Sequence, residues 1–198
     1  MENKKSNKLD FEERQIMRRN RKRNKIRFIQ GIKQLFLKKR NIIIFAIFIL
    51  GMTFVWFNRS VLLNVTPKSL EFLFKILIDI LYWIIFITLI SAVFMWFGKP
   101  KNAQEIEDDI KDLFNIKEPH RVPIIVSIIR NKKNIVKTYK FYSPDFARQK
   151  YEEEKTNIEQ KFGGKILNKI KSKGKYILFD TISNKNIKDV KELKDDRI

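Results

Sequence analysis

The chain has 198 residues, of which 42 are lysine or arginine and 22 are aspartate or glutamate, so its net charge is +20. It contains no cysteine, which excludes disulfides and thiolate metal sites. Residues 1–40 carry 15 basic and 4 acidic side chains, residues 41–98 carry 3 and 2, and residues 99–198 carry 24 and 16. An apolar middle between two polar ends predicts a membrane protein rather than a uniformly basic nucleic-acid binder.

Residues 1–40 form a basic N-terminal arm. In its last part, "IRFIQGIKQLFLKKR", apolar residues recur at helical spacing between basic ones: Ile26, Phe28, Ile29, Ile32, Leu35 and Phe36. The pattern predicts an amphipathic helix on the membrane surface that leads into the first span. DNA binding by the arm is the alternative, because the phosphates of DNA and of anionic lipids attract the same side chains.

Two apolar runs predict a two-helix transmembrane anchor at residues 41–97. "NIIIFAIFILGMTFVWFN" covers residues 41–58, and "ILYWIIFITLISAVFMWF" covers residues 80–97. Runs of this length reach about 27 Å as helices, close to the roughly 30 Å of the hydrocarbon core. Aromatic residues near their ends suit the lipid–water boundary. We expect transmembrane helices over about 41–60 and 74–97.

The flanking charges predict the orientation of the anchor. Basic residues precede the first span and follow the second, whereas the connecting loop has only Arg59 and Lys68. By the positive-inside bias, both termini are cytoplasmic and residues 60–73 face outward, as in a multi-pass protein of the cell membrane. Asp79 is the one acid in a span, and we expect it to pair with Lys75 rather than to form an ion site.

Residues 101–182 predict a small cytoplasmic α+β domain. "AQEIEDDIKDLFNI" places Ala103, Ile106, Ile110, Leu113 and Phe114 on one face of a helix that we expect Pro119 to end. "VPIIVSIIR", the turn "NKKN" and "IVKTYKFYS" then predict a β-hairpin.

The second half of this domain predicts another helix and a third strand. Ser143 and Pro144 are typical of a helix start, and Gly163 of a helix end. We expect "KILNKIKS" to add a short helix and "YILFD" to be the third strand. The order helix-strand-strand-helix-strand predicts a sheet with helices on one face. Residues expected in its core are Ile110, Phe114, Ile125, Ile128, Phe141, Ile158 and Leu178; residues 183–198 are expected to be a polar tail.

The sequence indicates no catalytic, cofactor-binding or metal-ligating residue and no cofactor. "FGGK" fails as a phosphate loop, because Glu159 stands where the first glycine belongs and Ile166 where the hydroxyl belongs. The single histidine, His120, lies in the turn-like "KEPHRVP", and one histidine alone makes no metal site. We expect His120 to be solvated.

The two spans, "IEDDIKDLFNI", "YSPDFARQKYEEEKTNIEQKFGGKILNKI" and "YILFDTISNKNIKDVK" together resemble the N-terminal part of FtsK/SpoIIIE-type coupling proteins of Gram-positive conjugative elements. The resemblance covers residues 40–195 and implies the anchor of a hexameric, ATP-driven DNA translocase. The motor's phosphate loop and acidic metal ligand are absent from this sequence. The chain is therefore expected to be no enzyme, and to be either a truncated form, a fragment or a standalone relative.

Three functions remain open. The first is a non-catalytic anchoring and assembly module of a DNA-transfer machine, with the lipid bilayer, further copies of the chain or a full-length motor protein as partners. The second is a two-span membrane adaptor or regulator unrelated to DNA transfer. The third is a membrane protein that binds nucleic acid, with DNA held by its basic segments.

Overall fold

A computed structural model describes residues 2–59, 61, 70–130 and 136–183 of the chain. The described residues divide into two compact units. The α+β unit comprises Met1–Arg23 and Lys99–Ile198, and the helical unit comprises Asn24–Gly98. Most of the predicted outward loop, the hairpin turn "NKKN" and nearly all of the polar tail lie outside the described residues.

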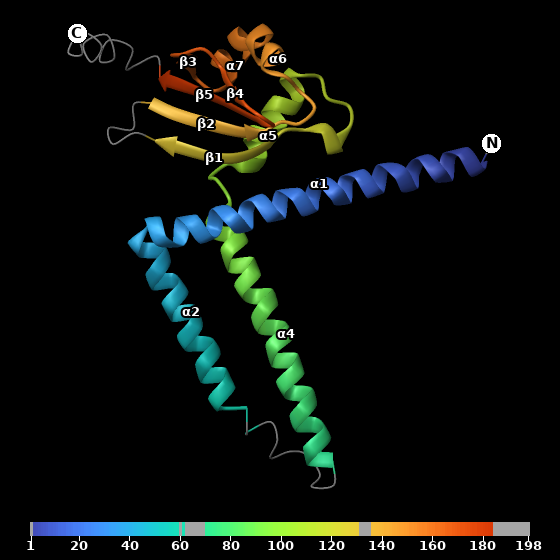
Figure 1. Cartoon of the computed structure of the whole chain (residues 1–198), viewed down its shortest axis with the longest axis vertical. Helices are drawn as coiled ribbons and strands as arrows, with labels where there is room; N and C mark the ends of the chain where they lie inside the picture. Colours follow the sequence, from blue (N-terminus) through green and yellow to red (C-terminus); the bar gives the residue numbers. More distant parts are fainter. Residues whose placement is uncertain (1, 60, 62–69, 131–135, 184–198) are drawn as a thin grey trace. The chain divides into compact units, whose positions relative to one another are not determined.

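An antiparallel sheet in the order β1-β2-β5-β3 forms the centre of the α+β unit, and β4 pairs with the same β5 (Figure 1). Strands β1 (Ile124–Arg130) and β2 (Val136–Tyr142) are the predicted hairpin, and β5 (Tyr176–Ser183) is the predicted third strand. Strand β5 lies in the interior of the sheet and pairs with β2 along seven positions, from Val136↔Ile182 to Tyr142↔Tyr176.

The segment "KILNKIKS" is not a helix, contrary to the sequence prediction. It contains two short strands, β3 (Gly164–Ile166) and β4 (Lys171–Lys173), which pair with different parts of β5. Ile166 and Ile170 are buried in the core. The extended form of this segment buries both isoleucines and pairs its backbone with β5. A single isolated helical turn would gain little from helix propensity alone, so the extended form is favoured.

The helix starts and ends in this unit differ from those predicted. Helix α5 (Ala103–Leu113) ends well before Pro119, with Asn115 in the left-handed region at φ 50°; Pro119 instead opens a short 3-10 helix, η2 (Pro119–Arg121). Ser143 does not cap a helix, because its hydroxyl donates to the carbonyl of Phe146 and its N–H donates to the carbonyl of Lys175.

The predicted helix after Pro144 is two shorter helices, α6 (Arg148–Glu153) and α7 (Lys155–Lys161). Gly163, with φ 65°, follows α7 and confirms the predicted helix stop, since glycine adopts this conformation without steric cost.

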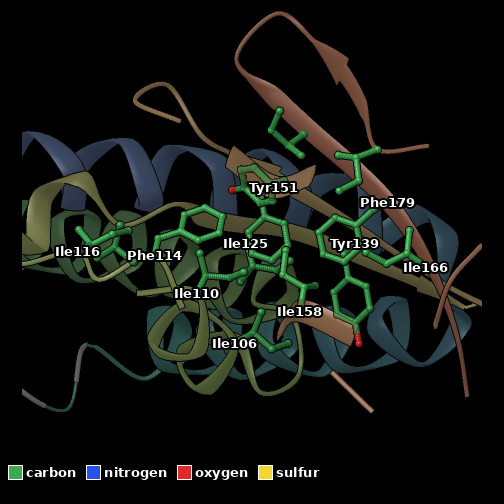
Figure 2. Packing of buried hydrophobic residues seen from close by; sticks show 14 of the residues in the cluster. Ile106, Ile110, Phe114, Ile116, Ile125, Tyr139, Tyr151, Ile158, Ile166 and Phe179 are labelled. Atoms are coloured by element: carbon green, nitrogen blue, oxygen red, sulfur yellow. The ribbon is translucent and has the colours of Figure 1, made fainter. Parts of the chain in front are cut away.

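The core of the α+β unit lies between the sheet and the helices α5, α6 and α7 (Figure 2). Five of the seven residues predicted for it are buried, and Ile128 is partly buried against it. The prediction for Leu178 is wrong: it is half-buried, while its neighbours Ile177 and Phe179 point into the core. Alternation along β5 places residue 178 on the opposite face of the sheet.

The helical unit contains two helices that are long and apolar enough to cross a membrane, as the sequence predicts. They are α2 (Lys39–Phe57) and α4 (Glu71–Gly98), and their apolar side chains are largely exposed. Helix α1 (Glu2–Leu37) is longer than the expected amphipathic segment, and one residue, Lys38, separates it from α2. Within the described segment of α1, Ile26 and Leu35 are buried, whereas Ile29, Ile32 and Phe36 are exposed.

Two glycines allow the backbones of α1 and α4 to meet inside the helical unit. A Cβ atom at Gly31 would overlap the carbonyl oxygen of Phe94, and a Cβ atom at Gly98 would overlap the carbonyl oxygen of Arg27. Small residues permit this close approach of helices. The crossing fixes residues 24–37 against the end of α4.

Candidate anion-binding cleft

A buried ion pair holds the first part of α1 against the rest of the α+β unit. The guanidinium of Arg19 donates from Nη2 to Oε2 of Glu107 on α5 over 3.0 Å, and from Nε to the carbonyl of Val122 over 3.0 Å. The side chains of Arg19 and Glu107 are only 13% and 5% exposed. Oε1 of Glu107 accepts the N–H of Ile125 over 3.3 Å, and Arg23 lies 3.9 Å from Oε2.

The environment of Arg19 shows how closely the two charges depend on each other. Burial lowers the pKa of the Arg19 guanidinium, while the neighbouring Glu107 carboxylate raises it and offsets part of that effect. A buried cation without its carboxylate would be costly. Arg19 and Glu107 therefore form a buried polar connection between the first part of α1 and the rest of this unit.

The sequence prediction missed Glu107, although a local signal was present. Residue 107 lies in the same helical stripe as Ala103, Ile110 and Phe114, so a carboxylate there points toward the core. A buried carboxylate needs a cationic or hydrogen-bonding partner. The identity of Arg19 as that partner could not be inferred, because the two residues are distant in sequence.

Beside this ion pair, α1 and the outer face of the sheet enclose a cleft of about 600 Å³. We call it the basic cleft; its walls include Phe11, Arg18, Arg19, Lys22, Arg121 and Tyr142. Ile124 and Tyr142 are paired across β1 and β2, and the adjacent pair, Ile125 and Phe141, faces the core. The cleft thus lies on the face of the sheet opposite the core.

The charge of the basic cleft is positive. Four cationic side chains line it, against one carboxylate, Asp145. Arg19 is neutralised by Glu107, and Arg121 lies 3.2 Å from the exposed Glu118. Among the described residues, no carboxylate lies within ion-pair distance of Arg18 or Lys22. These two cations are available to an anion.

Aromatic rings lie next to these cations. Within the cleft, Lys22 Nζ is 5.1 Å from the ring centroid of Tyr142; outside its lining, Lys140 Nζ is 4.6 Å from that of Tyr176. The two tyrosine rings contact each other edge to face at 5.6 Å. Phe11, on α1 like Arg18 and Lys22, also lines the cleft and is 59% exposed. The cleft can therefore hold a negative charge and, beside it, an apolar or ring-shaped group.

His120 lies in this cleft, half-buried, and not in a fully solvated turn as the sequence predicted. The "FGGK" segment follows α7 and enters β3, where Lys165 pairs with Ile182 of β5. Within residues 2–59, 61, 70–130 and 136–183, no group of three or more histidine, aspartate or glutamate residues is placed to hold a metal ion.

In the helical unit, Asp79 has a different partner from the one predicted. Its carboxylate lies 3.0 Å from Arg59, two residues after the end of α2, and not against Lys75 on its own helix. Arg59 also lies over the ring of Trp56, 3.5 Å from its centroid. Arg59 pairs with Asp79 in place of Lys75 because its guanidinium makes an ion pair and a cation–π contact at the same time.

Comparisons with known proteins give little further information. No protein-family model and no curated protein matches the sequence. Among solved structures, the chain is similar to the conjugation coupling protein TcpA of pCW3, in its monomer form with ATPγS. That similarity has a TM-score of 0.37 and 14% sequence identity, and it covers 42% of this chain and 23% of that chain. The match spans less than a quarter of the coupling protein, so we base no functional argument on it.

Proposed function

We propose that the chain is a non-catalytic membrane anchor and assembly module of a DNA-transfer machine, related to FtsK/SpoIIIE-type coupling proteins. The observation that carries this proposal is the division of the chain into an apolar helix pair and a separately packed α+β unit. The helix pair offers its apolar side chains to lipid, and the α+β unit offers a folded surface to a partner. The link to DNA transfer rests on the sequence resemblance described above.

In this proposal the partners are the bilayer and either further copies of the chain or a complete motor protein. Both termini are cytoplasmic, as the flanking basic residues indicate. The chain turns over no ATP by itself, because its sequence lacks the glycine-rich nest and oriented lysine that hold a triphosphate.

The test is co-purification of the tagged chain with a full-length coupling protein, together with an ATPase assay on the chain alone. A matched control carries the α+β unit behind an unrelated two-span anchor. We expect the chain to retain the motor protein and to show no turnover above a mock preparation. Robust intrinsic turnover would refute the non-catalytic role. Failure to retain any motor protein would favour an adaptor unrelated to DNA transfer.

The orientation is tested separately with single cysteines at Asn64 and Ser183. An impermeant thiol reagent applied to intact cells is expected to label Asn64 and to leave Ser183 unlabelled until the cells are opened. The absence of native cysteine removes background labelling. The reverse labelling pattern would overturn the orientation.

A further inference from the structure

The basic cleft has the composition of a binding site rather than of an ordinary gap beneath a helix. Its cations come from two separate elements, with Arg18 and Lys22 on α1 and Arg121 on η2. Gaps between packed elements are usually lined by apolar groups or by paired charges, because unpaired like charges repel one another. Here four cations line one cleft with a single carboxylate, Asp145, and two of them, Arg18 and Lys22, have no carboxylate within ion-pair distance among the described residues.

We propose that the basic cleft binds a phosphate-bearing ligand, with the phosphate held by Arg18, Lys22 and Arg121. Phosphate suits this arrangement because its tetrahedral oxygens accept hydrogen bonds from several directions, as donors on two elements require. A guanidinium matches two of these oxygens, and the lysine ammonium supplies a point charge. Phe11 and Tyr142 lie against the group that carries the phosphate.

Two sources supply this chemistry: a soluble phosphate compound and the headgroup of an anionic phospholipid. The volume of about 600 Å³ admits a ligand larger than inorganic phosphate. The rings of Phe11 and Tyr142 provide the apolar contact that such a ligand needs. Asp145 is the one carboxylate of the lining, and the cations outnumber it, so the cleft keeps a net positive charge for the anion.

The experiment uses the full chain in nanodiscs of phosphatidylcholine, with acylation of Lys22 measured by mass spectrometry. One arm adds inorganic phosphate or pyrophosphate, and the other replaces a fraction of the lipid with phosphatidylglycerol. We expect saturable protection of Lys22 of at least threefold in one arm, which identifies the source. Lys117, exposed and outside the cleft, reports general screening and is expected to label unchanged.

The cleft variant combines Arg18→Gln and Arg121→Gln and keeps Lys22, whose acylation is measured. We expect it to need about tenfold more ligand for the same protection, since it removes two charge-assisted contacts. The matched control, Lys165→Gln with Lys169→Gln, removes the same charge at exposed positions outside the cleft and is expected to behave as the native chain.

Several results would overturn the proposal. Protection that acetate gives equally well would reflect charge screening without phosphate recognition. Equal protection in the cleft variant, or no protection in either arm, would show that no phosphate binds in the cleft. Protection by an oligonucleotide alone would replace the proposal with a nucleic-acid site. None of these results bears on co-purification with a motor protein, so the two proposals fail independently.

Discussion

The ion pair between Arg19 and Glu107 gives the sharpest prediction about how α1 is held. Glu107→Ala removes the 3.0 Å contact to Arg19 and leaves the N–H of Ile125 without its carboxylate acceptor. Breaking a buried ion pair from one side costs about 3–5 kcal/mol. The Arg19 side chain is 13% exposed, and it becomes hydrated when the first part of α1 separates from α5. This hydration offsets part of the cost, so we expect about 2–3 kcal/mol.

Hydrogen exchange measured by mass spectrometry tests this prediction on the full chain in detergent. A loss of about 2 kcal/mol raises the equilibrium constant for local opening about 30-fold. We expect amides of residues 10–23 to exchange faster by about that factor in Glu107→Ala. Glu107→Gln keeps an oxygen that can accept the N–H of Ile125. Its exchange rate in residues 10–23 is expected to lie between those of Glu107→Ala and the native chain.

Asp108→Ala is the matched control, because it removes a carboxylate one residue away that is exposed on the same helix. We expect it to change exchange in residues 10–23 by less than threefold. Unchanged protection in Glu107→Ala would refute the view that this ion pair holds α1. An equal effect of Asp108→Ala would assign the docking to overall charge and not to the buried contact.

Three further substitutions test the packing of each unit. Phe179→Ala is expected to destabilise the α+β unit of the full chain in detergent by about 3–5 kcal/mol in urea unfolding, whereas Leu178→Ala costs about 1 kcal/mol; equal costs would contradict the assignment of β5 faces. Gly98→Ala is expected to lower the thermal midpoint of the detergent-solubilised chain, while Gly51→Ala, which meets no atom within 4 Å, does not; identical midpoints would argue against the close crossing. Arg59→Gln is expected to destabilise the helix pair by about 1–2 kcal/mol in the same thermal melt; an unchanged midpoint would show that the ion pair with Asp79 does not stabilise it.

The elements that the sequence predicted well are those with a strong local pattern. The apolar spans are long and uninterrupted, and the hairpin and β5 are rich in β-branched and aromatic residues. By contrast, β3 and β4 have three residues each. The two strands and the linker that joins them contain four lysines, a composition that is not typical of strands. Their extended form depends on pairing with β5, which no local signal contains.

The candidate site was beyond prediction for the same physical reason. Its cations were visible as part of a basic arm, but their arrangement depends on the contact of Arg19 with Glu107, far along the chain. The partner of Asp79 was mispredicted because the helical i, i+4 rule considers only one helix, whereas Arg59 comes from the neighbouring one. Charge counts therefore indicate that this part of the chain attracts anions, and tertiary contacts determine where the cations gather.

The glycine crossing between α1 and α4 has a consequence for biogenesis. Gly31 is synthesised long before Phe94, the residue whose carbonyl it meets, and all of α2 and most of α4 are synthesised in the interval. The last turns of α1 must therefore wait without their final neighbour until α4 has been made. A cross-link between these two positions in a pulse-chase experiment is therefore expected only once the second apolar helix has been made.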